Sequence, residues 1–558
     1  MFKKELSKVI SAKFELDSKE VESLLEIPPN PELGDFAFPC FILAKKLKKS
    51  PSVIASQNTD IASDLFERVK AVGPYLNFYL KNNVVLEQLE SEIKLKQVSA
   101  KEVIMLESPS PNTNKPLHLG HLRNILIAQS LQKLYEKLGH KVILTEIVND
   151  RGTHICKSML AYKLFGNDET PESAGMKGDK FVGKYYVKFA NEVKKDSSLD
   201  EKAQNMLVKW ENKDPEVVRL WSKMREWCLK GMLETYNELG LHIDSTYYES
   251  EIYLHGKEIV SQGRERGIFK EDETGAIFVD LESKGLGQKY LQRADGTSIY
   301  ITQDIYLGKK RFEDTNMDRM LYVVASEQKH HFKVLFEIFK LLNYSFASKC
   351  HHVSYGMVNL PDGKMKSREG TVVEIDELLE KTKDDAKRQI LERYPDLDSA
   401  NLSKRTDILA HSALRFFILK FDAEKDMVYD PKESLSFSGE SGPYVQYVYA
   451  RLSKLFEKAD VIPVKNSLLL NEDLEKLIGL KLIDFNEVVL KATNHKKPNY
   501  VCNYLLELSK LITKYYHEVK IISSNKDLMA ARLHLLSLAQ SVIKEGLDIL
   551  GITVIEEM

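Results

Sequence analysis

One stretch constrains the fold more than any other, Glu107-Ser-Pro-Ser-Pro-Asn-Thr-Asn-Lys-Pro-Leu-His-Leu-Gly-His-Leu-Arg123. It follows a short apolar run, Val103 to Leu106, which has the length and composition of a buried parallel strand. It precedes apolar residues at helical spacing, Leu122 to Leu138, which stop at Gly139. A strand, a polar turn and a helix N-terminus together form an anion site, because free backbone N–H groups and the helix dipole point at the turn.

Two histidines in this turn, His118 and His121, flank Gly120. Their rings bring two hydrogen-bond donors to one pocket, and glycine lets a flat group approach the backbone, so the turn predicts a nucleotide site. A His-x-Gly-His tetrapeptide also occurs by chance, so its position between strand and helix matters. Two further motifs support the prediction: Pro-Asn-x-x-Lys-Pro, from Pro111 to Pro116, and Lys364-Met-Lys-Ser-Arg368.

The composition describes a globular protein of several domains, because 558 residues exceed one hydrophobic core. The formal net charge is −2, so any nucleic-acid surface must be local. Lys45 to Lys49 is one candidate patch, with a solvated helix face as the alternative. Five scattered cysteines lack a Cys-x-x-Cys pair, so we expect neither disulfides nor a structural metal. Without a membrane-spanning run or a signal-peptide core, we expect a cytoplasmic protein that contacts no membrane, and we expect a monomer.

The pattern along the chain predicts an α/β fold with two appendages. Residues 1–95 read as a small N-terminal α+β domain that contains Gly34-Asp-Phe36 and Gly73-Pro-x-x-Asn-Phe78. Residues 101–375 alternate strands and helices, as a doubly wound parallel sheet of Rossmann type does. After the first strand we expect strands at 142–148, 275–281, 289–302, 319–325 and 352–359. Long charged helices interrupt the alternation from about 153 to 285 and predict an insertion.

The last third of the chain predicts helices throughout. Residues 376–405 form a charged helical connection with a break at Tyr394-Pro395. Residues 407–558 carry leucine-rich amphipathic helices and predict an all-α bundle.

These motifs together resemble those of the class I aminoacyl-tRNA synthetases, and Pro111 to His121 is similar to the arginyl-tRNA synthetase form of their first signature. The resemblance covers essentially the whole chain. It implies an N-terminal domain that contacts the outer corner of tRNA and an insertion that covers the acceptor end. Ala413-Leu-Arg415 and Ser441-Gly-Pro-Tyr-Val-Gln-Tyr447 extend it to the bundle, which would bind the anticodon. The implied activity is arginine–tRNA ligase, with L-arginine, tRNA(Arg) and ATP accompanied by Mg²⁺ as substrates.

The arginine side of such a site needs carboxylates, which pair best with a planar guanidinium. Glu107 ends the first strand, and Asp304 follows a predicted strand, at the edge of the sheet where ligands bind. A helix N-cap is the alternative for Asp304. The resemblance implies that Tyr300 and Asp304 contact the guanidinium, and that Asn112 and Gln328 bind the α-amino and carboxylate ends. We expect His330 and His331 to face solvent or to cap a helix.

On the ATP side, His118, Gly120 and His121 would face the phosphates and ribose. Gly356, Met357 and Val358 would lay their backbone along the adenine, as the resemblance implies. The predicted catalytic residues are Lys115, His118, His121, Lys364 and Lys366, with Lys364 also binding ATP.

The second motif departs from the family pattern. The usual wording is Lys-Met-Ser-Lys-Ser, whose second lysine touches the pyrophosphate, and here that position holds Ser367. We expect Lys115 to supply the missing cation, with Lys366 as the alternative.

Other functions fit some of these features. A glutamyl, glutaminyl or cysteinyl synthetase shares the signatures, but missing zinc cysteines disfavour the last, and Glu107 with Asp304 favours a cationic amino acid. A small-molecule nucleotidyltransferase would not need the helical C-terminus. A non-catalytic tRNA-binding relative would not need the two histidines, His118 and His121, or the lysines Lys115 and Lys364.

Overall fold

The computed structural model describes residues 2–297, 299–359 and 373–558. These residues form two compact units. The first comprises residues 1–94, 452–486 and 508–542, and the second comprises residues 95–451, 487–507 and 543–558. None of the helices in the described ranges combines the length and apolar character needed to cross a bilayer.

The first unit contains an N-terminal α+β region with a three-stranded antiparallel sheet in the order β1-β3-β2. Its elements are α1 (Phe2–Phe14), α2 (Ser18–Leu24), η1 (Pro31–Leu33), β1 (Phe36–Pro39), α3 (Phe41–Leu47), α4 (Pro51–Ser56), β2 (Phe66–Val72), β3 (Tyr75–Leu80), α5 (Asn82–Glu87) and α6 (Leu89–Glu92). Gly73 turns β2 into β3 with a φ of +56°, which glycine adopts without strain. Leu480 and Ile483 of α20 (Asp473–Ile483) pack against the core of this region.

The Gly-Asp-Phe motif is a structural part of this unit. Asp35 is buried and accepts a hydrogen bond from the Leu80 backbone N–H at 2.7 Å. Its carboxylate also pairs with Lys476 of α20 at 3.1 Å. The motif therefore ties the N-terminal strands to a helix that lies roughly 440 residues further along the chain.

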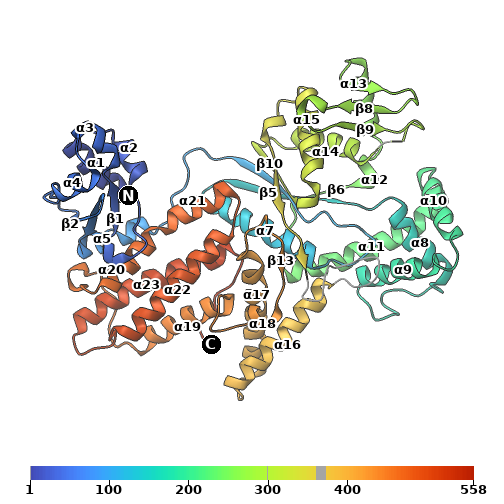
Figure 1. The fold of residues 1–558 in the computed structure, drawn as a ribbon. Coiled ribbons are helices and arrows are strands. Elements are labelled where there is room, and N and C mark those ends of the chain that lie inside the picture. Colours follow the sequence, from blue (N-terminus) through green and yellow to red (C-terminus); the bar gives the residue numbers. More distant parts are fainter. Residues whose placement is uncertain (1, 298, 360–372) are drawn as a thin grey trace. The chain divides into compact units, whose positions relative to one another are not determined.

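The second unit is built on a five-stranded sheet in which every neighbouring pair is parallel (Figure 1). The strands are β4 (Val103–Glu107), β5 (Lys141–Val148), β6 (Ser245–Tyr248), β10 (Arg319–Ala325) and β11 (Cys350–Tyr355). Their spatial order, β6-β5-β4-β10-β11, reverses direction between β4 and β10. This is the doubly wound arrangement expected from the sequence, and ligands bind at such a reversal point.

Helices make up most of the chain from residue 119 to the C-terminus (Figure 1). Up to residue 434 they are α7 (Leu119–Lys137), α8 (Thr153–Phe165), α9 (Gly178–Glu192), α10 (Ser198–Glu211), α11 (Pro215–Glu238), α12 (Glu249–Ile252), α13 (Gly256–Glu265), α14 (Tyr300–Asp314), α15 (Lys329–Leu341), α16 (Ile375–Arg393), α17 (Ser399–Leu419) and α18 (Pro431–Ser434). Beyond it lie α19 (Gly442–Lys458), α20, α21 (Phe485–His495), α22 (Asn499–Glu518) and α23 (Lys526–Ile549). Helices α8 to α11 lie within the predicted insertion of residues 153–285, and Tyr394-Pro395 separates helix α16 from α17.

Two predicted strands lie outside the parallel sheet. β7 (Lys270–Glu271), β8 (Ile277–Asp280) and β9 (Gln288–Gln292) form an antiparallel sheet of their own. The turn between β8 and β9 is too short for the crossover that parallel strands require. The predicted strand 289–302 is also too long, because Tyr300 already begins α14.

The fifth strand of the parallel sheet, β6, lies within the predicted insertion. Its sequence is Ser-Thr-Tyr-Tyr, without the continuous apolar run that marks a buried parallel strand. The predicted strand 352–359 is divided, because β11 ends at Tyr355 and β12 (Val358–Asn359) pairs with β13 (Met427–Val428).

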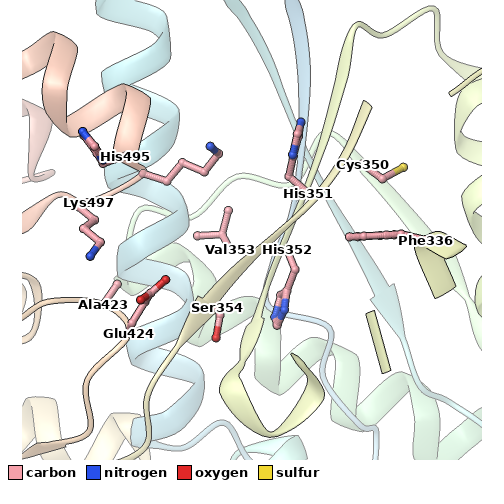
Figure 2. A pocket seen from close by; sticks show the side chains of 11 residues that line it. Phe336, Cys350, His351, His352, Val353, Ser354, Ala423, Glu424, His495 and Lys497 are labelled. Atoms are coloured by element: carbon pink, nitrogen blue, oxygen red, sulfur yellow. The ribbon is translucent and has the colours of Figure 1, made fainter. Parts of the chain in front are cut away.

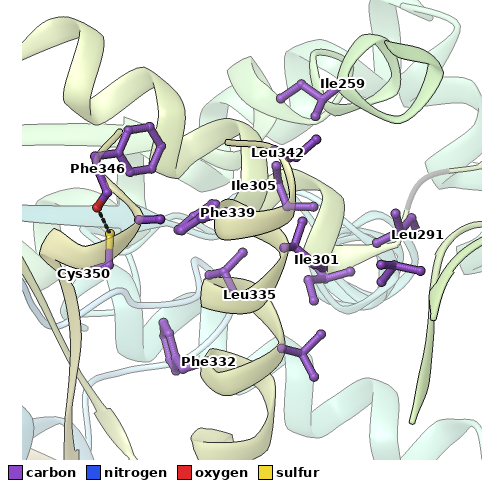
Figure 3. Packing of buried hydrophobic residues seen from close by; sticks show 14 of the residues in the cluster. Ile259, Leu291, Ile301, Ile305, Phe332, Leu335, Phe339, Leu342, Phe346 and Cys350 are labelled. Atoms are coloured by element: carbon purple, nitrogen blue, oxygen red, sulfur yellow. Dashed lines mark hydrogen bonds between the residues drawn. The ribbon is translucent and has the colours of Figure 1, made fainter. Parts of the chain in front are cut away.

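A hydrophobic core holds α14 and α15 in place (Figure 3). Ile301 and Ile305 of α14 pack with Phe332, Leu335 and Phe339 of α15, residues at intervals of three and four. Met105 of β4 and Met320 of β10 belong to the same cluster. This packing fixes the first turns of both helices beside the reversal point of the sheet.

Candidate active site

A cavity of about 570 Å³ lies at the carboxyl ends of β4, β10 and β11. It brings together many of the residues predicted from the sequence. The predicted residues on its lining are Glu107, His118, Gly120, His121, Asp304, Gln328, Gly356, Met357 and Val358.

The two histidines begin helix α7 and use the same ring nitrogen. His118 is the N-cap, and its Nδ1 accepts the Gly120 backbone N–H at 3.1 Å. His121 Nδ1 accepts the His118 backbone N–H at 3.1 Å, which completes a reciprocal cap. Because each Nδ1 is an acceptor, each neutral ring carries its proton on Nε2. Both rings therefore keep an Nε2–H donor for the cavity that they line.

Burial keeps these rings neutral. Burial, together with the positive charge of Lys115, lowers the pKa of His118 to about 4. Burial, His118 and Lys115 lower the pKa of His121 well below its usual value. At neutral pH the pair offers hydrogen-bond donors without a positive charge of its own. Gly120 is required beside them, since a Cβ there would lie 3.0 Å from Cε1 of His118.

Arg123, one turn into α7, is fully buried and holds the loops behind the cavity. Its Nη1 donates to the Gly356 carbonyl at 2.7 Å, and its Nη2 donates to the Lys425 carbonyl at 2.9 Å. It also donates to the carbonyls of Met357, Asp422 and Ala423. The segment predicted to lie along the adenine is thus fixed by the helix that carries both histidines, a role that the sequence did not reveal.

The two predicted carboxylates have different surroundings. Glu107 forms a buried ion pair with Arg311 of α14, and its Oε1 accepts a hydrogen bond from Ser110 Oγ at 3.2 Å. Asp304 Oδ2 lies 2.8 Å from His331 Nε2, with a third of the Asp304 side chain still exposed. His331 lines the cavity and pairs with Asp304, so our expectation that it faces solvent or caps a helix was wrong.

A third carboxylate, that of Glu249, lies near Asp304 and was not predicted from the sequence. Glu249 of α12 is buried, and this burial raises its pKa to about 7, helped by the negative charges of Asp150 and Asp304. Gln303 donates to it, and Arg151 lies 3.7 Å away over the ring of Tyr253. A short strand-to-helix turn inside a predicted insertion gave no reason to single out Glu249.

Several predicted residues do not line the cavity. Asn112 bridges to Asn149 between the ends of β4 and β5, and Asn149 rather than Asn112 reaches the cavity. Tyr300 begins α14 and is 66% exposed. Lys115 is partly buried in the turn before His118 and is followed by Pro116. The carbonyl of Pro111 accepts a hydrogen bond from the Asn149 N–H. Lys364 and Lys366 lie outside the described residues.

A second cavity, of about 370 Å³, lies at the edge strand β11 (Figure 2). His351 and His352 of this strand and His495 and Lys497 of the α21–α22 turn contribute to its lining. No residue of the first signature is among the described residues that line it, so it is not the candidate site. Among the residues that the structure describes, no group of three or more His, Cys, Asp or Glu side chains is arranged to hold a metal.

Comparisons with known families agree with this geometry. The family model "tRNA synthetases class I (R), catalytic domain" matches residues 84–430. "Arginyl tRNA synthetase N terminal domain" matches residues 1–80, and "DALR anticodon binding domain" matches residues 445–558. With a doubly wound sheet and a His-x-Gly-His turn at its reversal point, the chain is a class I aminoacyl-tRNA synthetase.

Individual relatives narrow the class further. An arginine–tRNA ligase of Treponema denticola is 42% identical over 96% of this chain and 94% of its own length. One from Bacteroides thetaiotaomicron is 43% identical over 85% of this chain and 84% of its own length. The Thermus thermophilus arginyl-tRNA synthetase has the same fold, with a TM-score of 0.81, 24% identity and full coverage of both chains. The chain belongs to the arginyl-tRNA synthetase family and is an arginine–tRNA ligase.

Proposed function

We propose that the cavity between β4, β10 and β11 is where this ligase activates L-arginine with ATP and then charges tRNA(Arg). The observation that carries the proposal is the pair of neutral histidines at the N-terminus of α7, whose Nε2–H groups have no partner among the described residues and can donate to phosphate oxygens. The dipole of α7 favours an anion at the same point, although the Leu119 and Gly120 N–H groups of its first turn already donate to Val373 and His118.

In the first step, a carboxylate oxygen of arginine attacks the α-phosphorus of ATP. The bond from that phosphorus to the bridging oxygen breaks, and its electron pair leaves with pyrophosphate. Catalysis here is mainly positioning and charge stabilisation, so no general base is required. In the second step, a hydroxyl of the terminal tRNA ribose attacks the arginyl carbonyl and releases AMP. Mg²⁺ would enter with ATP as part of the substrate.

For the guanidinium we favour Asp304 over Glu107 as the direct partner. Arg311 already neutralises Glu107, whereas Asp304 is partly exposed on the lining and bonded only to a histidine among the described residues. Glu249 adds a buried acid beside Asp304. Gln328 and Asn112 remain the candidates for the α-amino and carboxylate ends, and Tyr300 for a ring contact from the start of α14.

Replacing Asp304 with Asn tests this assignment, because the amide keeps the shape but loses the charge. The arginine KM of Asp304→Asn should rise by about 10²-fold or more, with the ATP KM nearly unchanged. His331→Ala, which removes the neighbour but leaves the carboxylate, should shift the arginine KM far less. Equal arginine KM values for wild type and Asp304→Asn would remove Asp304 from the pocket.

Lys115 is our candidate for the cation that the second signature lacks. Its pKa is lowered by burial, and no carboxylate among the described residues acts on it, so its charge is available to a substrate phosphate. Lys115→Ala should lower kcat of arginine-dependent ATP–pyrophosphate exchange by about 10²- to 10³-fold and leave the arginine KM nearly unchanged. If Lys366→Ala is the slow variant instead and Lys115→Ala is normal, the assignment is wrong.

The family resemblance adds roles for tRNA. We expect the N-terminal region to contact the outer corner, the insertion α8–α11 to cover the acceptor end and the C-terminal helices to bind the anticodon. We also expect ATP–pyrophosphate exchange to depend on added tRNA. Aminoacylation of total tRNA with each of the twenty amino acids would identify arginine directly. The expected monomeric state and cytoplasmic location stay predictions.

A further inference from the structure

We propose that helix α9 of the insertion positions Lys115 and the backbone on both sides of the nucleotide site, so that the insertion takes part in arginine activation. The proposal rests on the proposed role of Lys115. Three sets of contacts within the second unit carry it.

The first contact is between Gly183 of α9 and the signature turn. A Cβ on Gly183 would lie 2.8 Å from Cδ of Pro116 and 3.6 Å from Cα of Lys115. Helix α9 therefore approaches the Pro116 ring so closely that a side chain at position 183 would force the turn to shift. Lys115 directly precedes Pro116, so this contact limits where the lysine side chain starts.

The second set of contacts makes α9 a rigid support. At the start of the helix, a Cβ on Gly178 would lie 2.0 Å from the carbonyl oxygen of Trp227 in α11. A Cβ on Gly231 of α11 would lie 2.5 Å from the backbone nitrogen of Asp179. The two helices thus touch backbone to backbone, and Phe181 and Trp227 pack edge to face beside this contact. A support packed this tightly transmits displacement instead of absorbing it.

The third set links α9 to the segment that follows the second signature. Lys177, directly before α9, donates to Asp376 at 2.6 Å, and Thr235 of α11 donates to the same carboxylate at 2.9 Å. Lys180 pairs with Glu374 at 3.1 Å and with Glu377 at 2.5 Å. Asp376 and Glu377 lie in the first turn of α16.

That segment and the signature turn are bonded to each other. The Leu119 N–H donates to the Val373 carbonyl at 3.0 Å, and the Ile375 N–H donates to the Leu117 carbonyl at 3.0 Å. Helix α9 therefore supports a closed set of contacts that includes Lys115, the two histidines and residues 373–377. A shift of α9 moves the phosphate-facing groups, whereas α14, the helix that carries Asp304, is packed into a different core through Ile301 and Ile305.

The first test is Gly183→Ala, which must push the turn by several tenths of an ångström. Misplacing catalytic groups by such an amount lowers rates by roughly 10- to 100-fold. We expect this loss in kcat of ATP–pyrophosphate exchange with tRNA present, and an arginine KM within about twofold of wild type. Gly479→Ala is the matched control at saturating tRNA, because its Cβ would point into the packed contact between α20 and α5, 2.9 Å from Leu86, and any weakening of tRNA binding would appear in the tRNA KM. It should keep the wild-type kcat.

A rescue experiment separates positioning from general damage. In Gly183→Ala/Pro116→Ala the atom that the new methyl group meets is gone. The double variant should recover part of the kcat that Gly183→Ala loses, although Pro116→Ala alone is slower than wild type. A purely destabilising effect of Gly183→Ala would persist in the double variant, and this result would contradict the proposal.

The second test compares two lysines one turn apart on α9. Lys180 and Lys184 are 42% and 44% exposed, and both form an ion pair. Lys180 reaches Glu374 and Glu377, whereas Lys184 binds Glu169 within the insertion. Lys180→Ala should lower kcat by up to about fivefold, in line with a partly exposed ion pair. Lys184→Ala should leave it unchanged.

The outcomes distinguish this inference from the proposed function. In one outcome, Lys115→Ala loses kcat while Gly183→Ala and Lys180→Ala keep the kcat of their controls. In that case α9 does not position the site, and the proposed role of Lys115 stands. If Lys115→Ala is normal, that role fails and the positioning inference fails with it. Slow Gly183→Ala and Lys180→Ala variants with normal arginine KM, beside a crippled Lys115→Ala, support both.

Discussion

His118 and His121 divide their two ring nitrogens between structure and ligand. Each Nδ1 accepts a backbone N–H at the start of α7, so neither ring can rotate without losing the helix cap. Each Nε2 remains a donor, and burial keeps the rings uncharged. If both histidines were charged, they would strengthen the binding of ATP in the ground state as much as in the transition state, which would not accelerate the reaction. A neutral pair with fixed donors suits a site in which Lys115 supplies the charge.

A pH experiment tests the buried state of His118. Its folded pKa of about 4 lies below the 6.5 of the unfolded chain, so the unfolded chain binds more protons between these values. Stability is therefore fully present above pH 6.5 and is lost as the pH falls toward 4. His118→Asn keeps a capping side chain but cannot titrate. Between pH 7.5 and 5.5, wild type should lose about 1 kcal/mol more stability than His118→Asn.

The thermal unfolding midpoint at the two pH values measures this difference. His242→Asn is the control, because the His242 side chain is 89% exposed, and this variant should respond to pH as wild type does. If His118→Asn loses as much stability on acidification as wild type, the ring is not buried in the neutral form.

Among single residues, the sequence predicted those whose partners lie within a few positions along the chain. His118, Gly120 and His121 act within one turn of helix, so their spacing contains the geometry. Glu107 was predicted as a guanidinium ligand, but Arg311, 204 residues further on, pairs with it. No local pattern reports a partner at that distance, and the same holds for His331 beside Asp304.

At the scale of elements, α7 connects the two halves of the nucleotide site. Its first turn carries the histidines, and Arg123 one turn later donates to five backbone carbonyls in residues 356–357 and 422–425. A guanidinium can do this because its five N–H donors are fixed in a plane, whereas an ammonium has three on a flexible stem. In the proposed site, the helix would therefore fix the distance between the residues assigned to the phosphates and those assigned to the adenine.

Arg123→Lys tests this connection. Several buried carbonyls lose their donor, so we expect a loss of about 2–4 kcal/mol in stability and a rise of about tenfold in the ATP KM. The control is Arg415→Lys in α17, another buried arginine that donates to the Leu239 carbonyl at 2.6 Å, away from the cavity lining. This control should lose stability but keep its ATP KM. Equal ATP KM values in the two variants would contradict the role of Arg123.

Elements were predictable where their sequence pattern is strong and local. β4 and β10 carry continuous apolar runs, β5 carries two short ones around Thr145 and Glu146, and all three strands were found. β6 has no such run, and it becomes a strand only because β5 offers an unpaired edge. Tyr300 to Thr302 have strand propensity, yet they form the first turn of α14 because Ile301 and Ile305 must face the core one helical turn apart.

At the scale of the whole chain, the compact units do not follow the linear order of domains. The N-terminal 94 residues share a unit with residues 452–486 and 508–542, while residues 543–558 belong to the unit with the catalytic sheet. Lys137 of α7 pairs with Glu545 and Asp548 of α23 in that second unit. Cutting the chain near residue 405 would therefore remove part of the catalytic unit. Point substitutions test the tRNA-binding regions more cleanly than truncations do.

The ion pair between Asp35 and Lys476 is a buried link between the N-terminal strands and α20 inside the first unit. Both residues are 8% exposed, and their charges lie 3.1 Å apart. Removing one partner of a buried pair leaves an uncompensated charge, so Lys476→Met should lose about 3–5 kcal/mol. Asp35→Asn/Lys476→Met leaves no charge behind and should recover most of this loss. Lys465→Met is the control, since its pair with Glu87 is mostly exposed and should be worth less than about 1 kcal/mol.

The stability that Lys476→Met loses should depend on pH in a defined direction, whereas a loss caused by packing damage alone would not. Burial raises the pKa of Asp35 above its usual value, and Lys476 opposes the rise, so removing Lys476 raises the folded pKa further. A raised folded pKa means that the folded chain binds more protons, and stability then falls as pH increases from 3.8 through the folded value. Lys476→Met should therefore be closer to wild type at pH 5 than at pH 8, and the double variant should not show this difference. Hydrogen exchange of the Leu80 amide, which donates to Asp35, reports the opening of this link in the full-length protein. A Lys476→Met variant whose deficit is the same at both pH values would mean that lost packing, rather than an unpaired carboxylate, causes its instability.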